Sequence, residues 1–416
     1  MRRRLSSPER KVPMFYLGID VSLKSHRCAL IDTEGEKVGS SFTIAADRDG
    51  FTRLVDLLAE RSVPADALLI GMEATGHHWE NLLSFLESRG FAVRLLNPFQ
   101  TRRYRDVLAK KAKTDDIDAY CLAGLLRSGE ARGCYVPDDQ VQGLRDLVRL
   151  RATYADNLTV YRRQAYALLQ LVFPEVTTVV KDPFAKVMRE VLMRYPTAAD
   201  LAALSPRAIE KIARTFQGNN FDRDKAEALV RAARTSIYAG KAKASRGKVL
   251  ASLLGQMAGL EAALDDLDRS IQDALSPPGN GPSPADRLTA IPGIGPRTAA
   301  VLLAEIGDVS RFLSANHLVA YFGFFPVLFE SGGKSLGSPR MSRQGPKHLR
   351  QALYMASVAA LKHNPDLRAL YHRKISQGKA PKQALIVVAR KLLTLVYSLL
   401  RYQTNYDPRR LFLQPT

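Results

Sequence analysis

Patterns typical of β-strands are confined to the first third of this 416-residue chain and end near Gln140. Beyond that point apolar residues recur every three or four positions, which is the period of an α-helix. The strand-like stretches are short, apolar and bounded by polar turns or helical patterns. They lie at 14–22, 27–32, 37–44, 67–73 and 91–96, with helices predicted at 51–60 and 79–89. Because strands and helices mix only here, we expect an α/β domain over 13–137 and a helical remainder.

Two long helices are predicted in the middle of the chain, because apolar residues twice follow heptad spacing. The first seam runs from Leu144 to Val172, and the second runs from Leu253 to Ile271. Such seams are typical of coiled coils, although three heptads also fit an ordinary amphipathic core helix. The two seams could pair as an antiparallel hairpin within one chain, or between two chains in a dimer. We therefore expect a helical, coiled-coil region over 138–276.

Proline and glycine divide the rest of the chain. Residues 277–284 are rich in both and predict a linker, and a mainly helical C-terminal domain is expected to follow over 285–403. The aromatic residues at 321–325 are expected in the core of that domain. Residues 1–12 form a basic tail, and the residues after it lack the apolar segment of a signal peptide.

The charge balance predicts a polyanionic partner. Sixty-one Lys and Arg residues against 41 Asp and Glu residues give a net charge of +20 and a pI near 9.9. Fourteen cations and a single acid fall within 331–401, whereas a solvated helix face usually mixes both signs. Three widely spaced cysteines exclude a disulfide framework, and no long uncharged apolar run predicts a membrane span. We expect a cytoplasmic protein that binds nucleic acid.

Four carboxylates in the first domain are candidates for a metal site. Asp20 and Glu73 each lie at the end of a predicted strand. Asp115 and Asp118 are three residues apart at the start of a predicted helix, so they share one helix face from which Asp116 turns away. Oxygen ligands of this kind suit one or two Mg²⁺ ions, which can stabilise both the attacking and the leaving oxygen of a phosphoryl transfer. The alternative is that the helix-start acids cap the helix and balance its dipole.

Residues 288–308 predict a helix, a tight turn and a second helix. Gly293 and Gly295 permit the turn, and the amides that begin the second helix suit a phosphate group, as in helix-hairpin-helix motifs. The alternative is a packing turn between two core helices. The basic residues that we expect to contact nucleic acid are Arg102, Arg103, Lys111, Lys113, Lys334, Arg340, Arg343, Lys347 and Arg350.

Several motifs carry a resemblance to a known family. Gly-Ile-Asp-Val-Ser at 18–22, Met-Glu-Ala-Thr-Gly at 72–76 and Lys-Thr-Asp-Asp-Ile-Asp-Ala at 113–119 resemble the RuvC-like domain of DEDD-type insertion-sequence transposases. Ile-Pro-Gly-Ile-Gly at 291–295 and the Ser-Gly pair at 331–332 resemble the second domain of the same family, whose members are recombinases guided by a bridge RNA. The sequence departs from the family pattern at Phe324-Phe325 and Gly345-Pro346.

The resemblance implies an RNase H-like first domain in which Asp20, Glu73, Asp115 and Asp118 bind Mg²⁺. It also implies that Ser331 is the nucleophile, which chemistry alone would not separate from the serines around it. Ser331 would then cut donor and target DNA through a covalent phosphoserine. A guide RNA from the element would select the sites by base pairing, and the protein would act as a homo-oligomer.

Two other classes of protein remain open from the residues alone. A RuvC-like nuclease, such as a Holliday junction resolvase, would use the same carboxylates to activate water and would not need Ser331. A non-catalytic nucleic-acid-binding protein would keep the carboxylates as structural groups. His77 and His78 cannot share a helix face because they are adjacent, and we expect them, with Trp79, to pack at the start of a helix.

Overall fold

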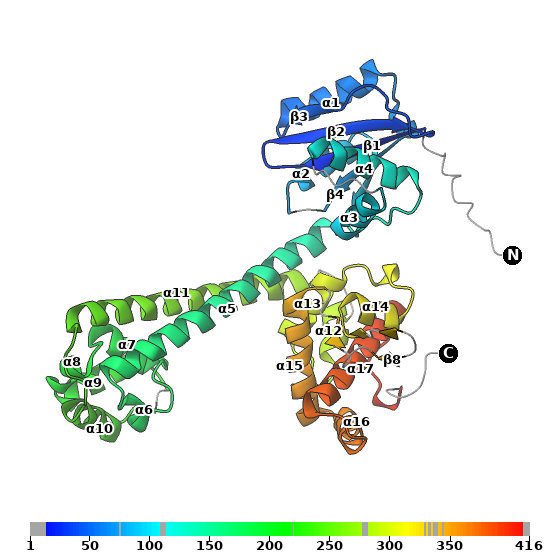
Figure 1. Ribbon diagram of the computed structural model, residues 1–416. Coiled ribbons are helices and arrows are strands. Elements are labelled where there is room, and N and C mark those ends of the chain that lie inside the picture. The colour runs from blue at the N-terminus through cyan, green and yellow to red at the C-terminus, as the bar shows by residue number, and fades with distance from the viewer. Residues whose placement is uncertain are drawn as a thin grey trace. The chain divides into compact units, whose positions relative to one another are not determined.

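The computed structural model describes residues 14–74, 76–108, 114–218, 220–276, 282–327, 330–331, 334–335, 340–342 and 345–410. It contains two compact units, the N-terminal unit Met1–Val136 and the C-terminal unit Pro137–Thr416. Figure 1 shows that strands of the one large sheet belong to the first unit, and that the second unit is built mostly of helices. Residues 277–281 of the predicted linker at 277–284 lie outside the described residues, as does the basic tail at 1–12, and the last linker residue, Pro284, begins a helix.

The N-terminal unit is a five-stranded mixed sheet with helices on both faces. Its strands lie in the order β3-β2-β1-β4-β5, with β2 antiparallel to both neighbours and β1, β4 and β5 mutually parallel. This sheet confirms the α/β prediction and is consistent with an RNase H-like fold. The elements are β1 (Phe15–Val21), β2 (Ser25–Asp32), β3 (Phe42–Ala45), α1 (Arg48–Glu60), η1 (Ala65–Ala67), β4 (Leu68–Glu73), α2 (Glu80–Glu87), β5 (Ala92–Leu96), α3 (Pro98–Val107) and α4 (Asp115–Arg127).

The third strand is shorter than the sequence predicts. We expected a strand over 37–44, but only Phe42–Ala45 pairs along β2, and Lys37 makes an isolated bridge to Ile31. Between them, Gly39 has a φ of +76°, a left-handed conformation that an extended strand does not contain. The glycine therefore separates the bridge from the strand.

Alternate residues of the strands face two separate cores. Leu17 and Ile19 of β1 are buried in one cluster with Leu54 of α1 and Leu82 of α2. Tyr16 of β1 belongs to the other cluster, which includes the α4 residues Leu122, Ala123, Leu125 and Leu126. Successive side chains of a strand point to opposite faces, so Gly18 and Asp20 lie on the α4 face together with Tyr16.

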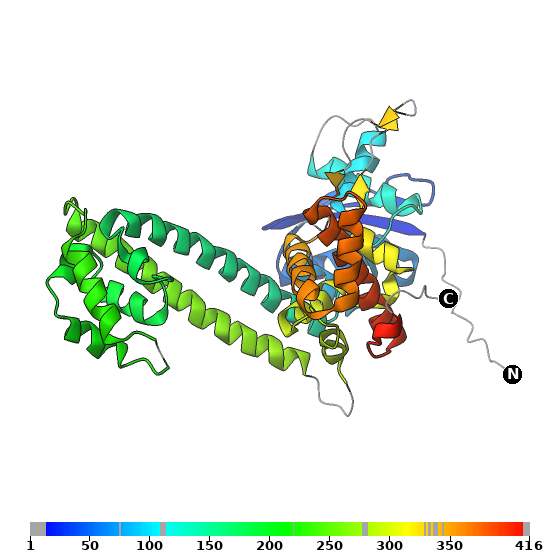
Figure 2. The same cartoon turned by 90° about the horizontal axis from the view of Figure 1, so that it is seen from below.

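The C-terminal unit begins with two long helices that lie side by side in one chain (Figures 1 and 2). Leu144 of α5 is buried near Ile271 of α11, and Leu169 of α5 near Leu254 of α11, so the two helices run antiparallel. Of the two pairings left open by the heptad seams, the hairpin within one chain is therefore the one observed. The helices are α5 (Asp139–Val172), α6 (Val176–Val179), α7 (Lys186–Arg194), α8 (Ala198–Ala202), α9 (Pro206–Ala213), α10 (Arg223–Arg234) and α11 (Lys243–Leu275).

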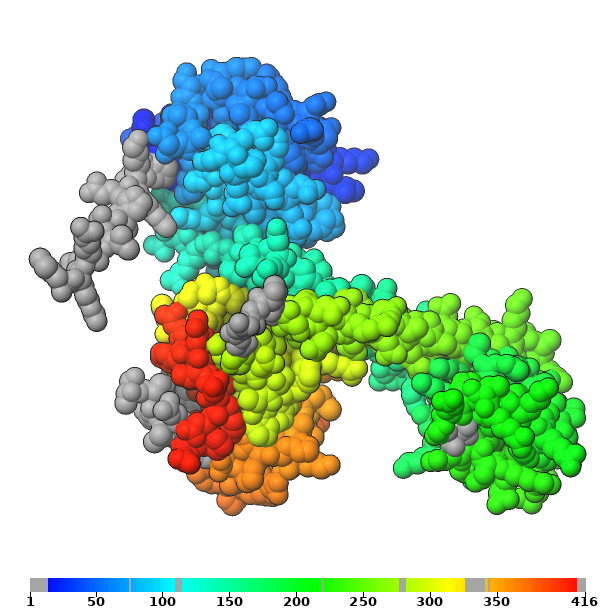
Figure 3. All heavy atoms as spheres, turned by 180° about the vertical axis from the view of Figure 1, so that it is seen from behind, coloured from blue at the N-terminus to red at the C-terminus, as the bar shows by residue number. Residues whose placement is uncertain are grey.

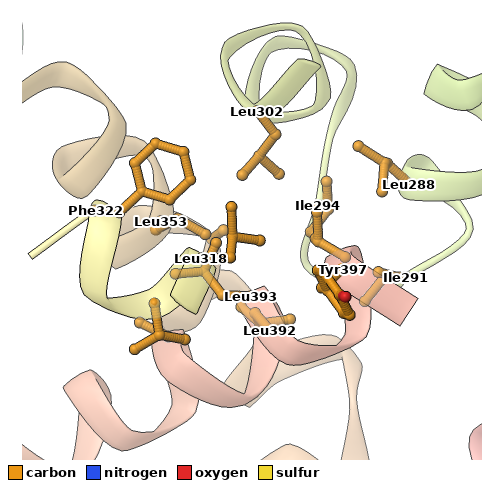
Figure 4. Packing of buried hydrophobic residues seen from close by; sticks show 14 of the residues in the cluster. Leu288, Ile291, Ile294, Leu302, Leu318, Phe322, Leu353, Leu392, Leu393 and Tyr397 are labelled. Carbon is orange, nitrogen blue, oxygen red and sulfur yellow. The ribbon is translucent and has the colours of Figure 1, made fainter. Parts of the chain in front are cut away.

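We call α5 and α11 the arm, and α6 to α10 the cap. The arm reaches from the cap to the last helices of the chain (Figure 3). Those helices form the C-terminal core, in which Leu392 and Leu393 of α17 pack against Ile291, Leu318 and Leu353 (Figure 4). The elements are α12 (Pro284–Thr289), α13 (Pro296–Ile306), η2 (Val309–Arg311), α14 (Ala315–Tyr321), β6 (Pro326–Val327), β7 (Glu330–Ser331), β8 (Lys334–Ser335), β9 (Arg340–Met341), α15 (Lys347–His363), α16 (Pro365–Ser376), α17 (Pro381–Tyr402) and η3 (Pro408–Arg410).

The predicted core role of the aromatic run holds for its central residues. Phe322 and Phe324 are buried in the C-terminal core, while Tyr321 is exposed.

Among the described residues, α17 is the one helix whose length and hydropathy would suffice to cross a membrane, and half of its apolar stretch is buried in the same core. Packing of this kind is common for the central helix of a globular domain.

Candidate functional site

Asp20 and Glu73 lie at the same edge of the N-terminal sheet. Asp20 is the last residue but one of β1, and Glu73 is the last residue of the parallel neighbour β4. Ile19 is paired with Met72 in the register of these strands, so Asp20 and Glu73 occupy the next positions across. Both carboxylates leave the sheet on the face covered by α4, because side chains alternate along a strand.

Two glycines bring α4 directly onto the sheet beneath these strands. A Cβ atom added at Gly18 would lie 2.0 Å from the carbonyl oxygen of Ala119 and 2.6 Å from the amide nitrogen of Ala123. A Cβ atom at Gly71 would lie 2.7 Å from the side chain of Leu126. At Gly18 the added atom would clash with helix backbone, so the close packing of α4 on β1 requires glycine there, whereas at Gly71 the Leu126 side chain would have to shift.

The direction of α4 places its first turn at the carboxylate edge. Its C-terminal residue Arg127 donates to the carbonyl oxygen of Thr33, which follows β2 beside the start of β1. Its N-terminal end lies near the opposite end of β1, because Asp116 pairs with Arg27, the cross-strand neighbour of Asp20. The acids of the α4 first turn and the two strand-end acids are therefore gathered at one edge.

Asp116 and Asp118 have different partners. Asp116 accepts hydrogen bonds from Arg27 and from the Ser41 hydroxyl, and these two bonds, with Arg27 the larger cause, hold the pKa of Asp116 below its usual range. Asp118 accepts a 2.6 Å bond from Arg105 of α3, and its side chain is only 15% exposed. Sequence reasoning missed both arginines, because their partners are set by the fold and not by spacing along the chain.

The four carboxylates share an edge but are not assembled into a metal cage. No group of three or more His, Cys, Asp or Glu side chains within the described residues is close enough to hold a metal ion. The Asp118 carboxylate forms an ion pair with Arg105, and Asp115 is exposed in the first turn of α4. The donor set nevertheless fits a hard divalent cation, which takes carboxylate oxygens as its protein ligands. Binding would require Arg105 to release Asp118.

The glycine-rich turn between α12 and α13 is part of the C-terminal core. Ile291 and Ile294 are buried, and Gly293 has a φ of +110° and lies against α15, where an added Cβ would be 2.7 Å from Ala360. Gly295 is exposed and caps α13, whose first residue is Pro296. The turn thus has the packing role that the sequence left open, and its exposed end at Gly295 remains the predicted contact for nucleic acid.

The backbone around the predicted nucleophile forms short antiparallel pairs. Ser331 in β7 is the cross-strand partner of Lys334 in β8, and Val327 in β6 is the partner of Arg340 in β9.

Of the other residues predicted to contact nucleic acid, Arg102 and Arg103 are exposed on α3. Lys347 lies 3.5 Å from Asp156 of α5, and Arg350 donates to the Gly345 carbonyl. The remaining three, Lys111, Lys113 and Arg343, lie outside the described residues.

A buried acid that sequence reasoning missed connects three helices of the C-terminal unit. Glu305 of α13 is 3% exposed and accepts hydrogen bonds from Arg149 of α5 at 3.0 and 3.1 Å. Its carboxylate is also 2.9 Å from the ring Nε2 of His348 in α15. Burial opposes ionisation of Glu305, but the bonds from His348 and Arg149 outweigh it and lower the pKa of Glu305 to about 2. The sequence signal that could have identified Glu305 is its position within the apolar run 301–306.

Family models match two separate parts of the chain. Residues 17–174 match the DEDD transposase family of the IS110 type, described as "Transposase", and residues 285–372 match the "Transposase IS116/IS110/IS902 family". The first match contains all four candidate carboxylates, and the second contains Ser331. The solved structure of RuvC from Thermus thermophilus aligns over 29% of this chain and 100% of its own, with 15% identity and a TM-score of 0.22.

Relatives align with nearly the whole chain. The "Mini-circle putative transposase for IS117" of Streptomyces coelicolor is 27% identical, covering 95% of this chain and 96% of its own. The 43.6 kDa protein of insertion element IS110 from the same organism is 26% identical, with the same two coverages. The pilin gene-inverting protein of Moraxella bovis is 25% identical, covering 95% and 98%. With two family matches that together span more than half of its residues, the chain belongs to the IS110 family of DEDD transposases.

Proposed function

We propose that this chain cuts and rejoins DNA during movement of an insertion sequence, through a covalent phosphoserine formed by Ser331. The observation that carries the proposal is the packing of α4 over Gly18 and Gly71, which gathers Asp20, Glu73 and the α4 acids at one sheet edge. Relatives named for transposition and for gene inversion support a reaction on DNA.

The four carboxylates would hold one or two divalent cations, Mg²⁺ in our proposal. Bound there, the cation would supply positive charge that polarises the scissile phosphate and stabilises the leaving 3′ oxygen. Asp20 and Glu73 are held by the ends of paired strands, so their backbone positions are fixed before a ligand arrives. Arg105 balances the charge of Asp118 until a cation takes the place of the guanidinium group.

Ser331 would form the bond that links protein to DNA. Its Oγ attacks the phosphorus, the bond from phosphorus to the 3′ oxygen breaks, and the proton lost by the serine hydroxyl is matched by one gained by the leaving 3′ oxygen. Attack by a second 3′ hydroxyl reverses these steps, joins the new strand and restores the serine. Each step exchanges one phosphodiester for another, so no external energy source is needed.

The choice of DNA sites would fall to a guide RNA from the element, with the protein reading backbone and shape. The excess of cations at 331–401, fourteen against one acid, supports such a role because backbone phosphates dominate the affinity of nucleic-acid binding. We also propose that the protein works as a homo-oligomer on donor and target DNA in the bacterial cytoplasm.

A denaturing gel tests the proposed chemistry. Purified protein is incubated with Mg²⁺, DNA carrying the element's ends and RNA transcribed from its flank, and a protein–DNA species that is sensitive to protease is sought. We expect this species for the wild type and its loss in the Ser331→Ala and Asp20→Ala variants. Ser335→Ala is the matched control for the serine, and it should retain the covalent species.

A second pair of variants tests the carboxylates. Asp118→Asn should abolish the covalent species, whereas Asp116→Asn should keep it, because Asp116 is held by Arg27 and Ser41. Strand cleavage that survives Ser331→Ala without any covalent species would contradict serine chemistry and favour a water-using nuclease. Salt-sensitive binding with no strand breakage at any Mg²⁺ concentration would favour a binding protein without catalysis.

A further inference from the structure

A cavity of the N-terminal unit lies next to the carboxylate edge. It has a volume of about 600 Å³, which is within the range of sites that hold small molecules. Its described lining comes from β2, the segment between β2 and β3, α3 and α4. Asp116 of the α4 first turn is part of this lining, and no role has been assigned to the other groups around it.

Two tyrosines form aromatic parts of the cavity wall. Tyr104 of α3 and Tyr120 of α4 are both half-buried, and both pack against the hydrophobic cluster beneath α4. Neither phenol hydroxyl forms a hydrogen bond with a residue that the structure describes. A wall of aromatic rings with unused hydroxyls suits a flat ligand whose faces are apolar and whose edges are polar.

Two glycines leave space in the cavity. A Cβ atom added at Gly124 of α4 would lie 3.0 Å from the phenol oxygen of Tyr104. Gly35 has a φ of +91°, which favours glycine, and a Cβ atom there would lie 3.0 Å from the central guanidinium carbon of Arg127. A side chain at either position would crowd a lining group, so the glycines preserve the volume that a ligand would fill.

Two cations line the cavity and form no ion pair with a described residue. The Lys37 ammonium lies 4.6 Å from the centre of the Tyr120 ring, and Arg127 donates a hydrogen bond to a backbone carbonyl. Asp116 is the single acid in the described lining, and its partner is Arg27. Arg27 is also the main group that lowers the pKa of Asp116, and Lys37 contributes least.

We propose that this cavity holds one unpaired nucleotide of a nucleic-acid strand. The base would stack on Tyr120, and its edge would bond to the hydroxyls of Tyr104 and Ser40. Stacking of a base outweighs an exposed cation over the same ring, so Lys37 would leave the ring and join Arg127 at the phosphate. The nucleotide must be unpaired, because a base within a duplex has its faces and its edge already engaged.

The position of the cavity gives this binding a use. Asp116 in its wall is adjacent to Asp115 and two residues before Asp118, so the nucleotide would lie within about one helical turn of candidate metal ligands. The strand would then be anchored beside the carboxylate edge. The inference deepens the proposed function and rests on it only in that the chain binds nucleic acid, because it does not require chemistry at Ser331.

Duplexes that offer a few unpaired nucleotides test the proposal in EDTA, with the full chain. One duplex carries a bulge of three adenines, and a second carries three abasic nucleotides at the same place, so both have the same phosphates. We expect the wild type to bind the adenine bulge about tenfold more tightly, and Tyr120→Leu to bind both alike. Tyr120→Phe keeps the ring and should keep the preference. Equal binding of both duplexes by the wild type would overturn the proposal.

Matched variants separate stacking from charge and from general damage. Tyr166→Leu removes an exposed tyrosine of α5 outside the cavity and should keep the preference, whereas an equal loss in Tyr166→Leu and Tyr120→Leu would show diffuse aromatic contacts and overturn the proposal. Lys37→Gln should make the slope of log K against log salt shallower by about 1, and Tyr120→Leu should leave that slope unchanged. Thermal melting confirms that each variant is folded.

A fluorescent base reports the stacking directly. With 2-aminopurine as the middle base of the bulge, binding to the wild type should quench its fluorescence, and binding to Tyr120→Leu should not. RNA and DNA bulges are compared, and the one whose quenching depends on Tyr120 identifies the strand; dependence in neither would contradict the proposal. Ser331→Ala should keep both the preference and the quenching, so failure of this inference and failure of the serine chemistry appear in different experiments.

Discussion

At the scale of single residues, Gly18 decides whether the carboxylate edge can form. Its missing side chain lets α4 approach β1, and an added Cβ would clash with helix backbone that has no freedom to rotate away. We predict that Gly18→Ala lowers the free energy of unfolding of the N-terminal unit by about 3 kcal/mol, the upper range for overpacking. Urea unfolding measures this. Gly143→Ala in α5, where nothing lies within 4 Å, should leave stability unchanged or raise it.

Arg105 is the residue that holds Asp118 in the absence of a cation. Without the Arg105 guanidinium the Asp118 carboxylate is available, so a divalent cation can bind it without first displacing the arginine. We predict that 10 mM Mg²⁺ raises the Tm of Arg105→Gln by more than it raises the Tm of the wild type, since a ligand stabilises the state that binds it. Asp118→Asn combined with Arg105→Gln should lose the extra shift. An equal Mg²⁺ effect in all three proteins would place the cation elsewhere.

At the scale of elements, Glu305 joins α13 to α5 and α15. The folded-state pKa of about 2 lies below the ordinary value of 4.5, so the ion pair stabilises the fold above pH 4.5 and is lost as the pH falls toward 2. We predict that Glu305→Gln lowers the free energy of unfolding at pH 7 by about 2 kcal/mol, less than for a fully buried pair because Arg149 is 49% exposed.

The pH dependence separates this ion pair from a general loss of packing. Urea unfolding at pH 7, 5, 4 and 3 should show wild-type stability falling between pH 5 and 3, with a smaller fall in Glu305→Gln. Glu190→Gln, which removes the exposed pair with Arg194 on α7, should change stability by at most about 0.5 kcal/mol. If the free energy of unfolding falls with pH equally in Glu305→Gln and the wild type, the Glu305 carboxylate is not the cause of the pH dependence.

The elements differ in how far the sequence could predict them. The apolar runs that contain Asp20 and Glu73 predicted the ends of β1 and β4 to within two residues, because the burial of a strand is visible as a local sequence pattern. The heptad seams predicted α5 and α11, but not whether they pair within one chain, since that depends on the loop and cap between them. The partners of Glu305 were not predictable, because Arg149 is 156 residues away in sequence.

At the scale of the whole molecule, positive charge and candidate carboxylates are divided between the two units. Residues 137–416 contain 40 Lys and Arg against 23 Asp and Glu, a net charge of +17 of the total +20. The N-terminal unit, with the four carboxylates, carries the remaining +3. A carboxylate site repels phosphate unless cations offset it, so most of the attraction for nucleic acid must come from the C-terminal unit or from bound metal.

The two units also have separate hydrophobic cores, which predicts that they unfold separately. Calorimetry of the wild type should then show two transitions. Gly18→Ala should lower the Tm of one transition by about 10 °C, and Glu305→Gln should lower the other by about 4 °C, because a larger unit shifts less for the same free energy. The double variant should show both shifts unchanged, as expected for independent sites. A single transition that moves in every variant would mean that the units fold as one cooperative body, and the carboxylate edge would then be stabilised by the rest of the chain.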